Sequence, residues 1–302
     1  MFTGLSAFPL TPFKNTSLTG ECIDFRAFER LIKRLTDARV DSICAMGSTG
    51  LYSYLSLEQK RSVAKATVEL AGDIPVMAGI GALRTADVLK NAQAMQQAGV
   101  KAVLLAPVSY HPLQEHEVYA LYETVCNNLS VPLCVYENPG VTQFSFSDDL
   151  YQAVARLPNV AAVKIPGTPF VDESGSERLQ TLRTLLPEGT AIGVSGDKFG
   201  TAGMAAGCDL WLSVVGGLFP KTVLRLISSV NANNSAEAQL KSQQLQGLWS
   251  LFVKNKGGMR VMATAAAILG ICEGNCLPAP LQTLGKQDRT ELEQLLKQLA
   301  LD

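Results

Sequence analysis

Short runs of hydrophobic residues recur along the chain at a nearly constant interval. Eight of these runs are short enough and apolar enough to predict buried strands, and they lie at residues 5–8, 42–46, 74–80, 102–106, 132–136, 160–165, 190–195 and 210–215. From the second run to the seventh, successive centres lie 27 to 33 residues apart. That interval is the length of a strand followed by a crossover helix, so the strands are expected to be parallel.

The segments between these runs show the periodicity of amphipathic helices. Residues 25–35 place their large apolar side chains on one stripe, and Ser56 precedes Gln59 at the spacing of a capping box. The residues expected to begin further helices as N-caps are Thr85, Ser147 and Ser235. Strand and helix therefore alternate along the chain.

This alternation predicts an α/β protein, a (β/α)8 TIM barrel over residues 1–230. The alternative is an open doubly wound sheet, but the glycine-rich GxGxxG loop that usually follows its first strand is absent. Residues 231–302 predict a C-terminal helical extension packed on the barrel. Three helices are expected there, at 236–254, at 258–269, and a last one opened by Asp288.

Charge and cysteine content narrow the classes of partner. The 26 lysines and arginines nearly balance 27 acidic residues, which leaves a net charge of -1 and no field to attract nucleic acid or a membrane surface. The seven cysteines form no CxxC pair, and with two histidines in the chain no metal site is expected, even where Cys272 and Cys276 lie close together. No basic leader or membrane-spanning run is found, so we expect a cytoplasmic protein.

In a barrel of this kind, reactive groups lie at the carboxyl ends of strands. Lys164 follows the apolar residues 160–163 at such an end, where burial disfavours the charged ammonium and favours a nucleophilic amine. The alternatives are a lysine that extends into solvent and a lysine paired with a carboxylate. Lys198 and Lys221 are weaker candidates because they lie in polar or glycine-rich loops.

Two other strand ends face the same mouth. Tyr136 ends the fifth predicted strand, and a phenol beside an amine can transfer the protons that Schiff-base formation requires; the alternative is a core tyrosine. Ser48 and Thr49 stand in a GSTG turn after the second strand, where hydroxyl groups and exposed backbone N–H groups suit a carboxylate. Alone, such a turn has little specificity.

Together, these motifs resemble those of the dihydrodipicolinate synthase and N-acetylneuraminate lyase family, the pyruvate-dependent class I aldolases. The resemblance covers nearly the whole chain, through FTGLSAFPLTPF at its start, GSTG at 47–50, YENPG at 136–140, VKIPG at 163–167 and SGD at 195–197. It implies a carbon–carbon lyase that forms a Schiff base with pyruvate or another 2-oxo acid, needs no cofactor, and assembles as a homotetramer.

The resemblance also implies roles for particular residues. Lys164 would form the Schiff base, Tyr136 would shuttle the proton, and Ser48 and Thr49 would hold the keto acid's carboxylate. Leu212 matches the position whose backbone carbonyl borders bound pyruvate. The two further substrate-binding candidates are Asp197, within the SGD motif, and Tyr110, one residue beyond the family's tyrosine position after the fourth strand.

Several positions depart from the family's pattern. Leu51 stands where a glutamate often follows the GSTG turn, and Val141 stands where the synthase has an arginine for the carboxylate of its aldehyde substrate. Lys198 replaces the acidic residue favoured by neuraminate lyases. We therefore expect a lyase or aldolase acting on a 2-oxo-3-deoxy sugar acid or a 4-hydroxy-2-oxo acid. The alternatives are dihydrodipicolinate synthase itself and a catalytically silent protein that binds keto acids.

Overall fold

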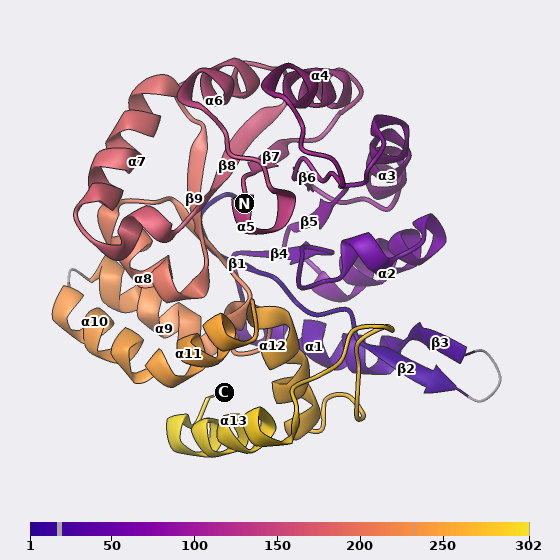
Figure 1. Ribbon diagram of the computed structural model, residues 1–302, viewed down its shortest axis with the longest axis vertical. Helices are drawn as coiled ribbons and strands as arrows, with labels where there is room; N and C mark the ends of the chain where they lie inside the picture. Colours follow the sequence, from indigo (N-terminus) through magenta and orange to yellow (C-terminus); the bar gives the residue numbers. More distant parts are fainter. Residues whose placement is uncertain (17–19, 233, 302) are drawn as a thin grey trace.

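The computed structural model describes residues 1–16, 20–232 and 234–301. Eight parallel strands close into a barrel in the order β1-β10-β9-β8-β7-β6-β5-β4, with helices around the outside (Figure 1). The barrel strands are β1 (Gly4–Ala7), β4 (Ser42–Ala45), β5 (Val76–Gly79), β6 (Ala102–Leu105), β7 (Leu133–Tyr136), β8 (Val160–Pro166), β9 (Ala191–Ser195) and β10 (Leu210–Ser213). The predicted (β/α)8 barrel is confirmed, and each strand lies within two residues of its predicted bounds.

An additional hairpin was not predicted. Strands β2 (Phe13–Thr16) and β3 (Gly20–Ile23) pair antiparallel between β1 and the first helix, and they project from the side of the barrel (Figure 1). The apolar pair of this hairpin, Phe13 and Ile23, lies at its base and is buried. Farther from the base the hairpin carries the charged residues Lys14 and Glu21. A hairpin so short and so polar has no hydrophobic pattern that a sequence analysis could detect.

The helices and helical turns around the barrel follow the predicted alternation. They are α1 (Phe25–Ala38), η1 (Tyr52–Tyr54), α2 (Leu57–Ala71), α3 (Thr85–Gln97), α4 (Glu115–Cys126), α5 (Pro139–Thr142), α6 (Asp148–Ala155), η2 (Thr168–Val171), α7 (Ser174–Leu185), α8 (Asp197–Ala206), η3 (Val215–Gly217) and α9 (Pro220–Asn231).

Two of the expected helix caps are present and two are not. The capping box of Ser56 and Gln59 is formed, and Ser147 accepts a hydrogen bond from the backbone of Leu150 at the start of α6. The other two assignments were wrong by one residue. Thr85 is the first residue of α3, and Ser235 is the first residue of its helix after an Asn234 cap.

The C-terminal region contains four helices among its described residues, where three were predicted. They are α10 (Ser235–Gln244), α11 (Gln246–Lys254), α12 (Gly258–Ile268) and α13 (Lys286–Leu299), and α10 and α11 pack on α8 and α9 (Figure 1). The predicted helix 236–254 is interrupted at Leu245. Asp288 is not a cap, because α13 begins before it and its carboxylate instead binds Lys254 Nζ at 2.6 Å.

The apolar core has two layers. The larger layer lies between the strands and the surrounding helices, and the smaller one fills the inside of the barrel. The inner layer includes Phe8, Cys44, Met77, Leu104, Ala106, Cys134, Tyr136, Ala162, Leu210 and Leu212. No helix within the described part of the chain is long and apolar enough to span a membrane.

Candidate active site

Lys164 lies inside the barrel, near the carboxyl end of β8. Ala162, two residues earlier on the same strand, belongs to the inner core, and side chains two apart on a strand face the same way. The Lys164 side chain is accordingly only 4% exposed. Its Nζ lies 3.7 Å from the centroid of the Tyr136 ring and 4.2 Å from that of Phe8.

The surroundings of this amine exclude both alternatives considered for Lys164, extension into solvent and pairing with a carboxylate. It is too buried to extend into solvent, and it forms no ion pair with any carboxylate that the structure describes. Two aromatic faces enclose it instead, and no acidic side chain is paired with it, so the nitrogen can approach a substrate. The thiols of Cys44 and Cys134 complete the environment. Burial raises the pKa of both, although the charge of Lys164 opposes the shift, so they remain neutral.

Tyr136 is fixed beside Lys164 by strand register. It ends β7 and pairs directly with Lys164 on the neighbouring strand, which brings the two side chains together at one level of the barrel. Its hydroxyl oxygen accepts a hydrogen bond from Asn138 Nδ2 at 2.7 Å. Since that bond uses the oxygen as an acceptor, the phenolic hydrogen remains available for donation to a substrate.

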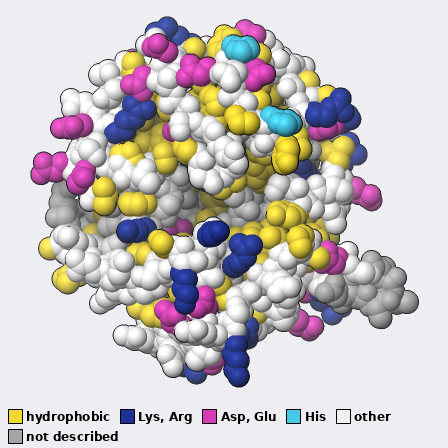
Figure 2. Space-filling view, in the orientation of Figure 1, with side chains coloured by type: hydrophobic (Ala, Val, Ile, Leu, Met, Phe, Trp, Pro, Cys, Tyr) yellow, Lys and Arg dark blue, Asp and Glu magenta, His cyan; other side chains and the backbone are white. Residues whose placement is uncertain are grey.

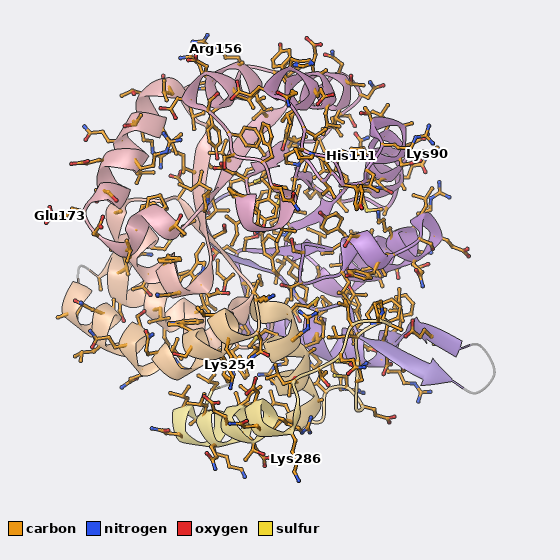
Figure 3. All side chains as sticks on the ribbon, viewed as in Figure 1. Lys90, His111, Arg156, Glu173, Lys254 and Lys286 are labelled. Carbon is orange, nitrogen blue, oxygen red and sulfur yellow. The ribbon has the colours of Figure 1, made fainter. Side chains whose placement is uncertain are left out.

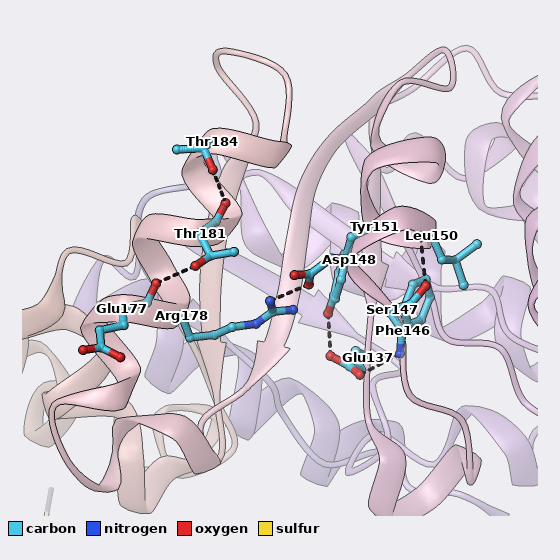
Figure 4. A network of polar contacts seen from close by, with 10 residues as sticks. All are labelled: Glu137, Phe146, Ser147, Asp148, Leu150, Tyr151, Glu177, Arg178, Thr181 and Thr184. Atoms are coloured by element: carbon cyan, nitrogen blue, oxygen red, sulfur yellow. Dashed lines mark hydrogen bonds and ion pairs between the residues drawn. The ribbon is translucent and has the colours of Figure 1, made fainter.

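Glu137 anchors the loop that carries Asn138. Its backbone N–H donates to the carbonyl of Lys164 at 3.0 Å, while its buried carboxylate faces away from the amine. Figure 4 shows that carboxylate between Phe146 and Tyr151: Phe146 N donates to Oε1 at 2.9 Å and the Tyr151 hydroxyl donates to Oε2 at 2.6 Å. Glu137 therefore joins the loop after β7 to α6.

The GSTG turn is held in an unusual backbone conformation. Met46 before it and Leu51 after it have backbone φ angles of 56° and 64°. Residues other than glycine rarely adopt this left-handed conformation. The carbonyl of Met46 lies so close to Gly79 on β5 that no Cβ could be accommodated there. Thr49 is buried in this turn and Ser48 is half-buried.

Ser48 and Tyr136 line a common small recess at the mouth of the barrel, which Tyr52 also lines. The remaining lining is apolar or glycine: Met46, Gly47, Gly79, Gly81, Leu104 and Ala106. Tyr136 therefore connects two of the predicted residues: it contacts Lys164, and it lines the same recess as Ser48. Sequence reasoning missed Phe8, Tyr52 and Asn138, which carry no pattern beyond ordinary aromatic and loop residues.

Leu212 lies in the inner core of the barrel, with its side chain against the backbone of Gly193, which is the register partner of Lys164. The predicted position of Leu212 near the amine is therefore consistent with the structure. Gly193 leaves room at this level, because a Cβ there would overlap the side chains of Leu210 and Leu212.

Asp197 has a different position from the one expected of a substrate-binding residue. It is buried at the start of α8, and its carboxylate accepts hydrogen bonds from Trp211 Nε1, Ser213 Oγ and the backbone N–H groups of Val214 and Val215. Burial raises the pKa of this carboxyl, and the four hydrogen bonds oppose that shift. Both oxygens are occupied, and Asp197 is not among the residues of the recess. It joins α8 to the end of β10.

Other candidates lie on the outer surface of this chain. Tyr110 is 83% exposed and meets His111 edge-on, with 5.2 Å between ring centroids. Figure 3 labels His111 in the loop between β6 and α4. Val141 is 60% exposed, and Lys198 is exposed, with its Nζ 5.5 Å from the ring of Phe199. Within one chain, none of these side chains enters the recess. Hydrophobic side chains gather around the middle of this face (Figure 2).

Comparison with known proteins gives matches over the full length. The model of the dihydrodipicolinate synthetase family matches residues 1–299. The 4-hydroxy-tetrahydrodipicolinate synthase of Rickettsia typhi is 27% identical over 302 residues, covering 100% of this chain and 98% of that protein. The crystal structure of a dihydrodipicolinate synthase from Agrobacterium tumefaciens superposes with a TM-score of 0.91 at 41% identity, covering 99% of this chain and 98% of that one. The crystal structure of dihydrodipicolinate synthase from Aquifex aeolicus superposes with a TM-score of 0.86 at 25% identity, covering 99% of this chain and 98% of that one.

Proposed function

The chain belongs to the dihydrodipicolinate synthetase family of class I carbon–carbon lyases, and from this premise we propose that it makes or breaks a carbon–carbon bond next to pyruvate through a Schiff base on Lys164. The observation that carries the proposal is the contact of the Lys164 amine with the Tyr136 ring, at 3.7 Å, inside an otherwise apolar barrel. A nucleophile and an acid–base group lie there side by side.

In this mechanism the Lys164 amine attacks the keto carbon of a 2-oxo acid. The resulting carbinolamine carries a hydroxyl group, which Tyr136 protonates so that it leaves as water and the imine forms. Loss of a proton from the adjacent carbon gives an enamine, whose carbon attacks an aldehyde to form the new bond. Cleavage runs through the same steps in reverse, with the protonated imine accepting the electron pair of the broken bond.

Proton transfer is assigned to Tyr136, and binding of the substrate carboxylate is assigned to the GSTG turn. Asn138 donates to the Tyr136 oxygen at 2.7 Å, which directs the phenolic hydrogen away from that amide and stabilises the phenolate formed during proton transfer. Ser48, Thr49 and the backbone N–H groups of their turn hold the substrate carboxylate. Leu212 belongs to the inner core of the barrel, near the level of Lys164, and its backbone carbonyl would border the bound acid.

The second substrate is an aldehyde other than aspartate semialdehyde, so that the full substrate is a 2-oxo-3-deoxy sugar acid or a 4-hydroxy-2-oxo acid. Val141 supports this choice, because an exposed valine in α5, the short helix after β7, cannot give a second carboxylate the paired hydrogen bonds of an arginine. The other candidate is the 4-hydroxy-tetrahydrodipicolinate synthase reaction. Its support is the name carried by relatives that match along the entire chain at 27% identity.

A homotetramer in the cytoplasm completes the proposal, from the family resemblance. The 83% exposure of Tyr110 is compatible with a contact made by a second subunit. Sedimentation velocity measures the assembly directly, and a monomer would exclude any site shared between subunits.

The substrate assignment is tested by comparing two reactions. One is condensation of pyruvate with aspartate semialdehyde, and the other is release of pyruvate from a panel of 2-oxo-3-deoxy sugar acids and 4-hydroxy-2-oxo acids. We expect a panel compound to give the highest kcat/KM, and Val141→Arg to raise the value for aspartate semialdehyde selectively. A higher kcat/KM for aspartate semialdehyde than for every panel compound would show the synthase reaction instead. Trapping of pyruvate without any turnover would indicate a silent keto-acid-binding protein.

A further inference from the structure

Tyr52 has a hydroxyl group that the fold does not satisfy. Four tyrosines are buried, and the hydroxyls of Tyr122, Tyr136 and Tyr151 each have a protein partner at 2.6 to 2.7 Å. Tyr52 is 8% exposed, yet its hydroxyl meets no hydrogen-bond partner among the described residues. The described side-chain atoms that are fully enclosed and lack a partner are Ser6 Oγ, Thr201 Oγ1 and Trp249 Nε1, and the Tyr52 oxygen is not one of them. Its hydroxyl is therefore accessible from outside the fold and can bind water or a ligand.

The position of Tyr52 connects it to the active site. It begins η1, which follows the GSTG turn after Leu51, and it lines the same recess as Ser48 and Tyr136. Its ring lies so close to Gly81 that a Cβ there would come within 2.8 Å of Cε2. The left-handed φ of Leu51 and the glycine at 81 together fix the ring in this place, so its burial is a property of the fold.

The environment keeps this phenol neutral and able to donate. Burial raises the pKa of Tyr52, and the neighbouring Tyr136 raises it further, so the hydroxyl keeps its proton at physiological pH. The recess offers three side-chain hydroxyls, those of Ser48, Tyr52 and Tyr136, on a lining that is otherwise apolar or glycine. A ligand that suits this set has an oxygen acceptor at one end and a small apolar body.

We propose that Tyr52 is a further substrate-contacting residue, which donates a hydrogen bond to a carboxylate oxygen of the 2-oxo acid bound at Lys164. The inference rests on the proposed function and adds a second phenol to the site. Ser48, which shares the recess, supplies a further hydroxyl for the same carboxylate. Tyr52 therefore contributes to selection of 2-oxo acids over simple ketones.

The test compares Tyr52→Phe with Tyr54→Phe. Tyr54 lies on the same helical turn but is 46% exposed and does not line the recess, so it is a matched control. The measurement is the pyruvate concentration that gives half-maximal borohydride trapping on the protein. We expect Tyr52→Phe to raise it about 10- to 150-fold, the value of a hydrogen bond to a charged group. Tyr54→Phe should match the parent.

Hydroxyacetone separates a carboxylate contact from a structural effect. It offers a ketone without a carboxylate, so trapping of hydroxyacetone should be the same in the parent and in Tyr52→Phe. A Tyr52→Phe protein with the parent's pyruvate dependence, or with an equal loss toward both compounds, would overturn the inference while leaving the Schiff base intact. Absence of pyruvate trapping in the parent would instead overturn the proposed function, and this inference with it.

A second variant keeps the test decisive if Tyr52→Phe does not fold. Gly81→Ala adds a Cβ where the Tyr52 ring now lies, so the ring must move away. We expect weaker pyruvate trapping and unchanged hydroxyacetone trapping, as for Tyr52→Phe. An unchanged pyruvate dependence in Gly81→Ala would contradict the proposed contact.

Discussion

Replacing Tyr136 by phenylalanine removes one oxygen atom from the site and keeps everything else that the ring provides. The ring face remains 3.7 Å from Lys164 Nζ, so the amine keeps its aromatic surroundings. What is lost is the group that transfers protons to and from the carbinolamine. We expect kcat to fall by about 10²- to 10⁴-fold, the usual contribution of a positioned acid–base group.

The structure also limits how much stability this substitution removes. The Tyr136 hydroxyl has one protein hydrogen bond, from the partly buried Asn138, and losing such a bond costs about 0.5 to 1.5 kcal/mol. For a 302-residue chain, an unfolding entropy of about 2.1 cal/mol/K per residue gives about 0.6 kcal/mol/K. The melting midpoint should therefore fall by only about 1 to 2.5 °C, far too little to explain the loss of turnover.

The assay combines steady-state turnover, thermal unfolding and pyruvate trapping. Tyr122→Phe is a control for the loss of a buried phenol, because Tyr122 donates to the carbonyl of Leu105, contacts Tyr136 only through its backbone, and packs in the outer core away from the recess. It should lose a similar amount of stability and keep its kcat. Parent-like turnover in Tyr136→Phe, or an equal loss of kcat in Tyr122→Phe, would refute the assignment of Tyr136 as the proton shuttle.

Three further outcomes follow from the packing around the site. Glu137→Ala leaves Phe146 N and the Tyr151 hydroxyl without their buried acceptor, so chemical denaturation should show a loss of about 2 to 6 kcal/mol, against a smaller loss for Glu137→Gln. Gly193→Ala places a Cβ against leucine side chains beside Lys164 and should cost about 1 to 3 kcal/mol, and a neutral result in the same experiment would contradict the packing. Burial raises the pKa of Tyr122 and Tyr151 well above 10, so the stability they contribute is complete below the unfolded value of about 10 and is lost as pH rises beyond it. Their absorbance change at 295 nm should appear together with unfolding, and ionisation of all tyrosines in the folded protein would contradict this.

The barrel could be predicted from the sequence because its strands are buried on both faces. Such strands appear as short apolar runs, and their constant spacing admits only parallel strands joined by helices. The same logic placed Lys164 and Tyr136 at one mouth, and the register confirms that they are neighbours. Where burial is slight the pattern disappears, and the β2–β3 hairpin was missed for that reason.

The rest of the site depends on contacts between segments far apart in the sequence. Phe8 reaches Lys164 from the start of the chain, across 156 positions, because the first and last strands close the barrel. Tyr52 lines the recess only because Gly81, on another loop, leaves space for its ring. Asp197 was assigned to substrate from its motif, whereas its partners on β10 and in the residues that follow occupy the carboxylate. Such partners become visible only when the chain is folded.

The central claim is that Lys164 forms a Schiff base with a 2-oxo acid. Incubation with pyruvate and borohydride, followed by mass spectrometry of the whole chain and of its peptides, tests this claim most directly. We expect one reduced pyruvyl adduct per chain, on the peptide that contains Lys164, and none in Lys164→Arg. An adduct on Lys198 or Lys221, or the absence of any adduct in the parent protein, would contradict it.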